Sequence, residues 1–351
     1  MRYNRLGSTG LIVSELCLGA MTFGTDPGMF AAIAGLDQDA STSMVKQALD
    51  AGINFIDTAN VYTRGQSERF VGQALKDLGV ARSDVVIATK AMGSMGEGPN
   101  DAGTSRYHLL HQIDASLERL GIDHVDLYQI HGWDSQTPMD EALRALDDIV
   151  RTGRARYIGV SNWAAWQIMK ALGISERLGL EKFASLQAYY TIAGRDLERE
   201  IVPMLESEGV GLMVWSPLAG GLLSGKYTRE DDGLSGGEGR RAKFDFPPVE
   251  KDRAWDVIDA LREMADAKGK TVAQLALAWL LYQPAVSTVI VGAKRADQLA
   301  DNIGACDVEF GAEELQKLGT LSRLPREYPG WMLARQGGYR SVSPRRVPGE
   351  E

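Results

Sequence analysis

Eight short apolar segments alternate with amphipathic helical segments along almost the whole chain. Runs such as "VVIAT" and "VDLYQI" are rich in β-branched and aromatic residues, which is typical of short strands buried inside a parallel sheet. The eight expected strands are residues 15–18, 55–57, 85–89, 125–130, 157–160, 184–187, 211–215 and 288–291. Parallel strands joined by helical crossovers either close into a (β/α)8 barrel or open into a doubly wound sheet.

Helices are expected between these strands because apolar residues recur there at helical spacing. Gly52 and Gly121 stand where a helix commonly ends, and Pro138 stands where one commonly begins. The expected helices are residues 42–51, 67–78, 104–120, 138–152, 163–172, 197–208, 252–268, 271–282, 295–304 and 312–321. An irregular tail is expected after them.

A closed barrel is favoured over the open sheet. The glycine pattern G-x-G-x-x-G, which marks the dinucleotide-binding open sheet, is absent after the first strand. Residues 1–13 contain two apolar runs around "GSTG", which predicts a β-hairpin that plugs the bottom of a barrel. We therefore predict an α/β fold with one domain over residues 1–351, comprising the hairpin, a (β/α)8 TIM barrel over 15–322 and a tail over 323–351. Long loops, among them 93–103 and 231–243, are expected at its C-terminal face.

Length, charge and cysteine content limit the functional class. The 351 residues suit one barrel with long loops, and the formal net charge of -9 argues against a nucleic acid or an anionic membrane as main partner. The longest apolar stretches are too short to span a bilayer, and the first residues lack a secretory signal. Cys17 and Cys306 are expected to be buried thiols, without metal-binding spacing. We expect a cytoplasmic monomer or homo-oligomer that binds a small molecule and no metal.

Four polar residues, Asp57, Tyr62, Lys90 and His131, lie near the ends of successive strands. In a (β/α)8 barrel the carboxyl ends of the strands carry the active site, so this placement predicts a catalytic group. A lysine at the end of a buried strand is costly unless it is paired, and Asp57 is its nearest expected partner.

Each of these residues also has an ordinary structural explanation when taken alone. Asp57 suits a strand-end turn, Tyr62 suits packing, and His131 suits a buried histidine with a hydrogen-bond partner; only Lys90 demands a reason by itself. His108 and His111 share one helix face, but no third ligand accompanies them, so a metal site is not expected.

Several longer segments resemble the aldo-keto reductase superfamily, over about residues 5–339. They are "GINFIDTANVYTRGQSERFVGQAL", "ARYIGVSNW", "SLQAYY", "VWSPLAGGLLSGKY" and "VGAKRADQLADN". The fourth resembles the bacterial and potassium-channel-β-subunit-like branches. The resemblance implies that hydride from NADPH reduces an aldehyde or ketone to an alcohol, with no Rossmann domain, which is consistent with the missing glycine pattern.

The resemblance also implies roles for the four polar residues. Tyr62 would be the general acid that protonates the carbonyl oxygen. Lys90 would lower the tyrosine pKa from its usual ~10 by placing a cation beside the phenolate. Asp57 would hold Lys90 charged and oriented, and His131 would orient the carbonyl by a hydrogen bond.

Cofactor-binding residues follow from the same resemblance. Ser161, Asn162 and Gln187 would bind the nicotinamide carboxamide, and Trp215 would stack on the ring. The further candidates are Thr22, then Ser216, Pro217, Leu218, Gly220, Lys226 and Arg241 near the pyrophosphate, and Gly292, Lys294, Gln298 and Asn302 near the adenosine. A cation near the 2′ position is the usual basis for choosing NADPH, and Lys294 is the candidate.

The substrate pocket is expected to be apolar. Its candidates are Phe23, Trp133, Tyr189 and Trp331, which suit a fairly large or apolar carbonyl compound. Gly132 and Trp133 stand where many relatives carry Arg or Lys, so the pocket wall differs from theirs.

Two other functions remain open from the sequence. One is a Schiff-base aldolase or lyase with Lys90 as nucleophile, against which the nicotinamide-type segments count. The other is a non-catalytic, cofactor-sensing regulatory subunit, against which the intact set of four polar residues counts.

Overall fold

A closed barrel of eight parallel strands forms the centre of the molecule. We describe the chain from a computed structural model, which covers residues 1–25, 33–229, 241 and 245–339. The strands run in the order β10-β3-β4-β5-β6-β7-β8-β9, and β10 pairs with β3 to close the ring. Their bounds are β3 Leu16–Gly19, β4 Phe55–Asp57, β5 Val86–Ala91, β6 Val125–Ile130, β7 Ala155–Ser161, β8 Phe183–Tyr189, β9 Gly211–Trp215 and β10 Val286–Val291. The predicted (β/α)8 barrel is confirmed.

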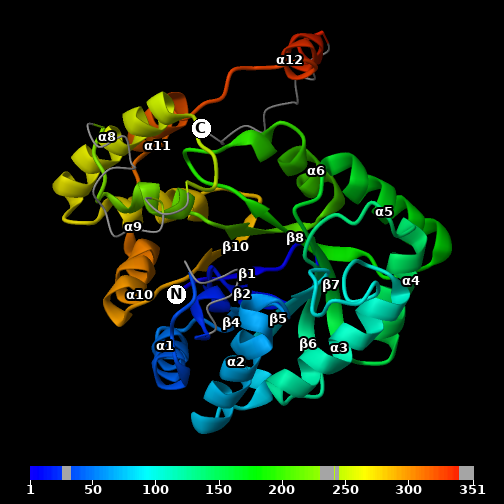
Figure 1. Cartoon of the computed structure of the whole chain (residues 1–351). Helices are drawn as coiled ribbons and strands as arrows, with labels where there is room; N and C mark the ends of the chain where they lie inside the picture. The colour runs from blue at the N-terminus through cyan, green and yellow to red at the C-terminus, as the bar shows by residue number, and fades with distance from the viewer. Residues whose placement is uncertain (26–32, 230–240, 242–244, 340–351) are drawn as a thin grey trace, which may run out of the picture.

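Helices surround the barrel on its outer side (Figure 1). They are α1 Gln38–Asp50, α2 Gln66–Asp77, α3 Arg106–Leu120, α4 Met139–Arg151, α5 Ala165–Leu178, α6 Ile201–Glu208, α8 Lys251–Lys268, α9 Val272–Leu281, α10 Ala296–Ile303, α11 Ala312–Leu321 and α12 Gly330–Gly337. Most of them bury apolar residues against the barrel, as α5 does with Ile168, Ala171 and Leu172, whereas α12 has no buried residue. The predicted alternation is therefore confirmed, although several ends differ.

The differences in helix ends have local causes. Helix α1 begins four residues earlier than expected because the Asp37 side chain accepts a hydrogen bond from the Ala40 amide and caps it. Helix α5 continues past the expected end at residue 172, since its buried face extends to Ser175, and it ends at left-handed Gly179. The expected irregular tail contains α12, whose residues "WMLARQ" are mostly good helix formers.

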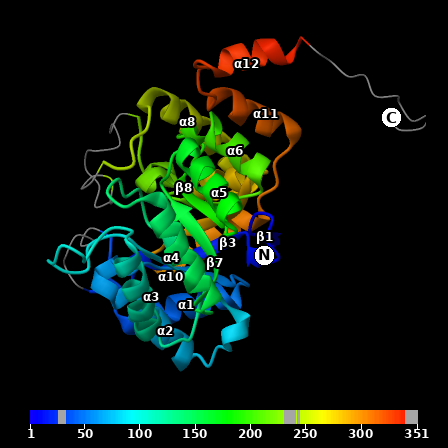
Figure 2. The same ribbon diagram turned by 90° about the vertical axis from the view of Figure 1, so that its right-hand side faces the viewer.

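The hairpin consists of β1 Tyr3–Arg5 and β2 Ile12–Ser14, which pair antiparallel as predicted. Leu6 and Val13 are fully buried against residues of the barrel interior, including Cys17, Phe55 and Leu127. Figure 2 shows β1 and the N-terminus at one end of the barrel, while the loop that follows β5 (cyan) projects at the other end. The hairpin thus closes the N-terminal end and leaves the C-terminal face for a ligand.

Other sequence expectations concern cysteines, metals and membranes. Cys17 and Cys306 are buried free thiols. Within residues 1–25, 33–229, 241 and 245–339, no cluster of three or more His, Cys, Asp or Glu side chains is arranged to hold a metal ion. No helix among these residues combines the length and hydropathy needed to cross a bilayer. Apart from Arg241, residues 231–243 of the expected loop and residues 340–351 of the expected tail lie outside the described structure.

Candidate active site

Parallel strand register brings the four predicted polar residues to one place. Asp57 is the last residue of β4 and lies beside Ala88 of β5. Lys90 lies one residue before the end of β5 rather than after it, and His131 directly follows β6. Tyr62 begins the single turn η2, Tyr62–Gly65, which follows β4. All four are therefore at the C-terminal face of the barrel.

The Lys90 ammonium is buried and held by three oxygens. Its Nζ lies 2.5 Å from Oδ2 of Asp57, 2.8 Å from the carbonyl oxygen of Thr58 and 3.5 Å from the Tyr62 hydroxyl. The Lys90 side chain has no exposed surface, and that of Asp57 is 3% exposed. Burial opposes the charge on Lys90, but Asp57 and Tyr62 more than offset this and raise the lysine pKa above its ordinary value. A permanent cation therefore lies beside the tyrosine.

Tyr62 is buried between this cation and His131. Its ring meets the imidazole edge-on, with ring centroids 5.7 Å apart and an interplanar angle of 74°. Burial raises the pKa of Tyr62, Lys90 lowers it and Asp57 raises it, so that it ends above its ordinary value. The cation acts in the direction expected from the sequence, but the loss of phenolate hydration outweighs it.

His131 is a neutral group in this environment. Its backbone amide donates to the carbonyl oxygen of Ala91 at 3.0 Å, which fixes the start of the loop after β6. Burial and the nearby Lys90 charge lower the imidazole pKa to about 3. A neutral imidazole can donate a hydrogen bond to a carbonyl oxygen without adding charge to the site.

Two glutamine side chains donate hydrogen bonds to the Asp57 carboxylate oxygen that does not contact Lys90. Nε2 of Gln187 donates to Oδ1 of Asp57 at 2.9 Å, and Nε2 of Gln129 donates to the same oxygen at 3.2 Å. Ser161 in turn donates from Oγ to the carbonyl oxygen of Gln187 at 3.0 Å. Gln129 was not among the sequence candidates. A glutamine inside an apolar strand was nevertheless a usable signal, because a buried amide needs partners.

Trp215 lies at the end of β9 within a group of aromatic rings. Its Nε1 donates to Oδ1 of Asn162 at 2.9 Å, and Asn162 adopts the left-handed φ of 59° that asparagine tolerates. The indole stacks on Phe246, with centroids 6.0 Å apart at 15°, and tilts against Tyr189 at 5.3 Å. Phe246 carried no recognisable sequence signal, because it is distant in the chain and meets Trp215 only through folding.

The glycine-rich segment after β9 forms the turn η5, Ala219–Ser224, with positive φ at Ala219, Gly220 and Gly221. Arg241 is buried and donates to the carbonyl oxygens of Ala219 at 2.6 Å and Pro247 at 3.1 Å. It also pairs with Asp245 at 2.7 Å. Arg241 therefore holds this turn in place, a role that the sequence candidates did not include.

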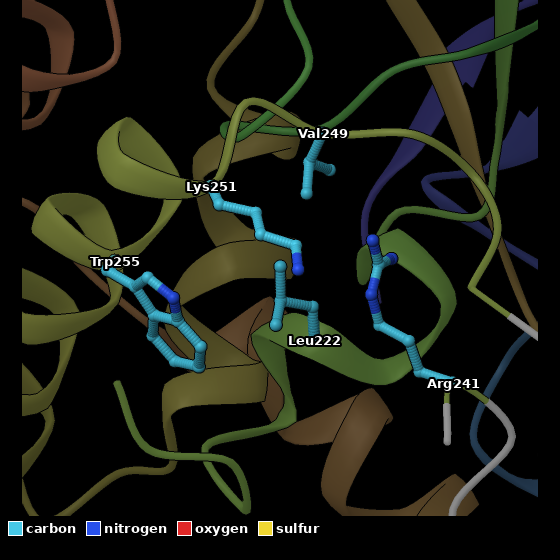
Figure 3. A pocket seen from close by; sticks show the side chains of 5 residues that line it. All are labelled: Leu222, Arg241, Val249, Lys251 and Trp255. Carbon is cyan, nitrogen blue, oxygen red and sulfur yellow. The ribbon is translucent and has the colours of Figure 1, made fainter. Parts of the chain in front are cut away.

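A small pocket adjoins this turn. It is lined by Leu222, Arg241, Val249, Lys251 and Trp255. Figure 3 shows the charged ends of Arg241 and Lys251 facing the same space from opposite sides.

The remaining cofactor candidates lie around the same face. Lys294 donates from its backbone amide to Oε1 of Gln298 at 3.0 Å and from Nζ to the carbonyl oxygen of Ala34 at 3.3 Å. Asn302 is buried on α10, and Gly292 directly follows β10. Ser216, Pro217 and Leu218 link β9 to η5. Lys226 lies beyond that turn, with Nζ 5.0 Å from the ring centroid of Tyr227.

Three of the four pocket candidates lie just past or at strand ends. Phe23 is fully buried after β3, Tyr189 ends β8, and Trp133 follows β6. Trp133 packs edge-on against Trp163, with centroids 4.9 Å apart. The fourth candidate, Trp331, lies on α12 at the periphery of the molecule, with 46% of its surface exposed (Figure 1).

Comparison with known proteins places this chain among oxidoreductases. Residues 15–323 match the model of the Aldo/keto reductase family. A protein of Arabidopsis thaliana named "Probable voltage-gated potassium channel subunit beta" is 40% identical over 314 residues, which cover 88% of this chain and 92% of that protein. Versiconal hemiacetal acetate reductase of Aspergillus parasiticus is 38% identical, covering 91% of this chain and 96% of its own length. "Uncharacterized oxidoreductase YrpG" of Bacillus subtilis is 36% identical, covering 92% and 96%.

Proposed function

This chain belongs to the aldo/keto reductase family, and from that premise we propose that it is an NADPH-dependent oxidoreductase that reduces an aldehyde or ketone to an alcohol. The observation that carries the proposal is the buried Lys90 ammonium, which lies 2.5 Å from Asp57 and 3.5 Å from the Tyr62 hydroxyl. A cation fixed beside a phenol is what a tyrosine needs in order to release a proton during a reaction.

The residues at the C-terminal face suit a dinucleotide. The Thr22 and Tyr189 hydroxyl oxygens are buried there without a hydrogen-bond partner in the described structure, as expected of atoms that a ligand completes. We assign the carboxamide to Ser161, Asn162 and Gln187, and the nicotinamide face to Trp215. We assign the phosphates to η5 together with Lys226 and Arg241. We assign the adenosine end to Gly292, Lys294, Gln298 and Asn302.

When bound, the cofactor supplies a hydride to the carbonyl carbon of the substrate. The Tyr62 hydroxyl donates its proton to the carbonyl oxygen, and Lys90 stabilises the phenolate that remains. Asp57 keeps Lys90 protonated and pointed at Tyr62. The neutral imidazole of His131 orients the carbonyl oxygen by a hydrogen bond. We propose that this chemistry occurs in the cytoplasm on a fairly large or apolar carbonyl compound.

The first test is a titration of the protein with NADPH and with NADH, followed by quenching of tryptophan fluorescence. We expect saturable quenching at lower concentrations of NADPH than of NADH, and loss of most of the quenching in Trp215→Phe. Tyr62→Phe should bind NADPH as the unaltered protein does but turn over no aldehyde. Failure of both nucleotides to bind, or normal turnover by Tyr62→Phe, would refute the proposal.

A regulatory subunit is the second candidate function. Its support is the 40% identity to a protein whose name describes a potassium channel subunit. The four polar residues with their reactive geometry favour catalysis instead. Negligible turnover over a broad aldehyde panel, together with tight NADPH binding, would reverse that preference.

The third candidate, a Schiff-base aldolase, is disfavoured by the state of Lys90. Such a nucleophile requires a neutral amine, whereas Asp57 and Tyr62 raise the pKa of this buried lysine. Borohydride should therefore trap no carbonyl adduct on Lys90.

A further inference from the structure

The backbone directly after Tyr62 has an unfavourable conformation. Thr63, Arg64 and Gly65 have φ angles of 49°, 53° and 85° in succession. The left-handed region disfavours L-residues other than glycine and asparagine, and a β-branched threonine most of all. Such backbone persists only where surrounding contacts hold it. The turn that carries Tyr62 must therefore be held from outside.

One side of the turn is held by contacts with the segment after β3. Thr63 donates from Oγ1 to the carbonyl oxygen of Phe23 at 2.8 Å, and Ser67 donates from Oγ to that of Ala20 at 2.7 Å. These two hydrogen bonds hold the turn and the start of α2 against the segment 20–23, which follows β3. They do not connect it to β5, the strand that carries Lys90.

The other side is held by a buried ion pair between Glu68 and Arg119. Nε of Arg119, on α3, lies 2.5 Å from Oε2 of Glu68, in the first turn of α2, and these side chains are 10% and 0% exposed. Oε1 of Glu68 accepts a hydrogen bond from Thr89 at 2.5 Å, and Thr89 precedes Lys90 in β5. The Arg119 side chain also covers the turn, since a Cβ on Gly65 would lie 2.6 Å from its Cδ.

We propose that Glu68 and Arg119 are a positioning pair that ties the turn 62–65 to strand β5 and so keeps the Tyr62 hydroxyl within reach of Lys90. Neither residue contacts the reacting groups, and the inference rests on the proposed role of Tyr62 as proton donor. Ion pairs this deeply buried contribute little net stability compared with apolar side chains of the same size. A geometric role explains the pair better than stability does.

Glu68→Gln is the most direct test, because it keeps the shape but removes the charge, and its single amide oxygen cannot accept from both Thr89 and Arg119 as the two carboxylate oxygens do. We expect kcat to fall by about tenfold or more, while the Kd for NADPH is unchanged. An unchanged kcat in Glu68→Gln would overturn the proposal.

A second readout does not depend on turnover, so it separates failure of this inference from failure of the proposed function. The pKa of Tyr62 is followed by fluorine NMR in protein containing 3-fluorotyrosine, with the Tyr62→Phe variant identifying the signal. Lys90 lowers the pKa of Tyr62, so displacement of the ring in Glu68→Gln should raise it. An unchanged pKa would contradict the positioning role even if the protein reduces no carbonyl compound.

A matched ion pair at the opposite end of the barrel serves as the control. Nη2 of Arg82 lies 2.7 Å from Oδ2 of Asp126, near the start of β6, with side chains 24% and 15% exposed. Asp126→Asn should lower the melting temperature but leave kcat and the pKa of Tyr62 unchanged. If Glu68→Gln does not fold, Arg119→Lys replaces it, since it keeps the charge and loses only part of the cover over Gly65.

Discussion

Gln187 donates a hydrogen bond from Nε2 to Oδ1 of Asp57 at 2.9 Å, across 130 residues of sequence. The other carboxylate oxygen of Asp57 lies 2.5 Å from Nζ of Lys90. The residue that we assign to the nicotinamide carboxamide is thus bonded to the carboxylate that holds the cation. If these proposed roles hold, cofactor binding and proton donation depend on the same hydrogen-bonded group, and a change at Gln187 should affect both.

Gln187→Leu removes the donor to Asp57 and the proposed amide contact with the cofactor together. We expect the Kd for NADPH to rise about tenfold, as for the loss of one or two hydrogen bonds, with a decrease in kcat as well. Fluorescence titration and steady-state kinetics measure the two effects. Gln129→Leu is the matched control, because Gln129 donates to the same oxygen at 3.2 Å and has no proposed contact with the cofactor. A weaker NADPH affinity in that control would contradict the assignment.

Asp57→Asn leaves the buried Lys90 ammonium without its counter-charge. Breaking a buried pair in this way costs about 3–5 kcal/mol of unfolding free energy, whereas replacing both partners by apolar residues costs far less. Urea unfolding should therefore show a large loss of unfolding free energy for Asp57→Asn and for Lys90→Met, and for the two combined a smaller loss than the two single losses added together. Additive losses would mean that the two charges do not depend on each other.

The pKa of His131, lowered to about 3, gives stability a pH dependence of known sign. In the unfolded chain a histidine titrates near ~6.5. Because the folded state binds the proton less readily, this contribution is complete above that pH and is lost as the pH falls toward 3. His131→Gln should therefore lose less unfolding free energy than the unaltered protein as the pH falls. Urea unfolding at successive pH values measures this difference.

The control for this effect is His108→Gln. Burial also lowers the pKa of His108, which lies on α3 and is bonded to the carbonyl oxygen of Asn100. His108→Gln should also reduce the loss of unfolding free energy at low pH, but it should leave kcat unchanged. His131→Gln should reduce kcat. If His131→Gln and the unaltered protein lose equal unfolding free energy as the pH falls, the lowered pKa of His131 is contradicted.

Lys294→Ala should weaken NADPH binding much more than NADH binding. A hydrogen bond between charged groups contributes about 1.5–3 kcal/mol, which corresponds to an increase of roughly 10- to 100-fold in the Kd for NADPH. Arg295→Gln is the control, because Arg295 is exposed and paired with Asp297 at 2.8 Å. Equal weakening of both nucleotides by Lys294→Ala would place the 2′-phosphate elsewhere.

The barrel and the location of its site follow from local sequence patterns. Alternating apolar strands and amphipathic helices are visible within windows of a few residues, and strand ends predict which side chains share a face. The partner of Lys90 was also predictable, because a buried ammonium demands a nearby carboxylate. The local apolar pattern also predicted the boundaries of β6 and β9 to the residue.

The features that tune the site were decided only by tertiary structure. The contacts of Gln129 with Asp57, of Glu68 with Arg119 and of Phe246 with Trp215 join residues far apart in the chain, and no local pattern identifies such pairs. The pKa of Tyr62 depends on how far burial outweighs the Lys90 charge, which is a property of the assembled surroundings. By itself the sequence determined that Asp57, Lys90 and His131 stand near the C-terminal ends of their strands. Only packing decided their distances and solvation, because those depend on many distant residues at once.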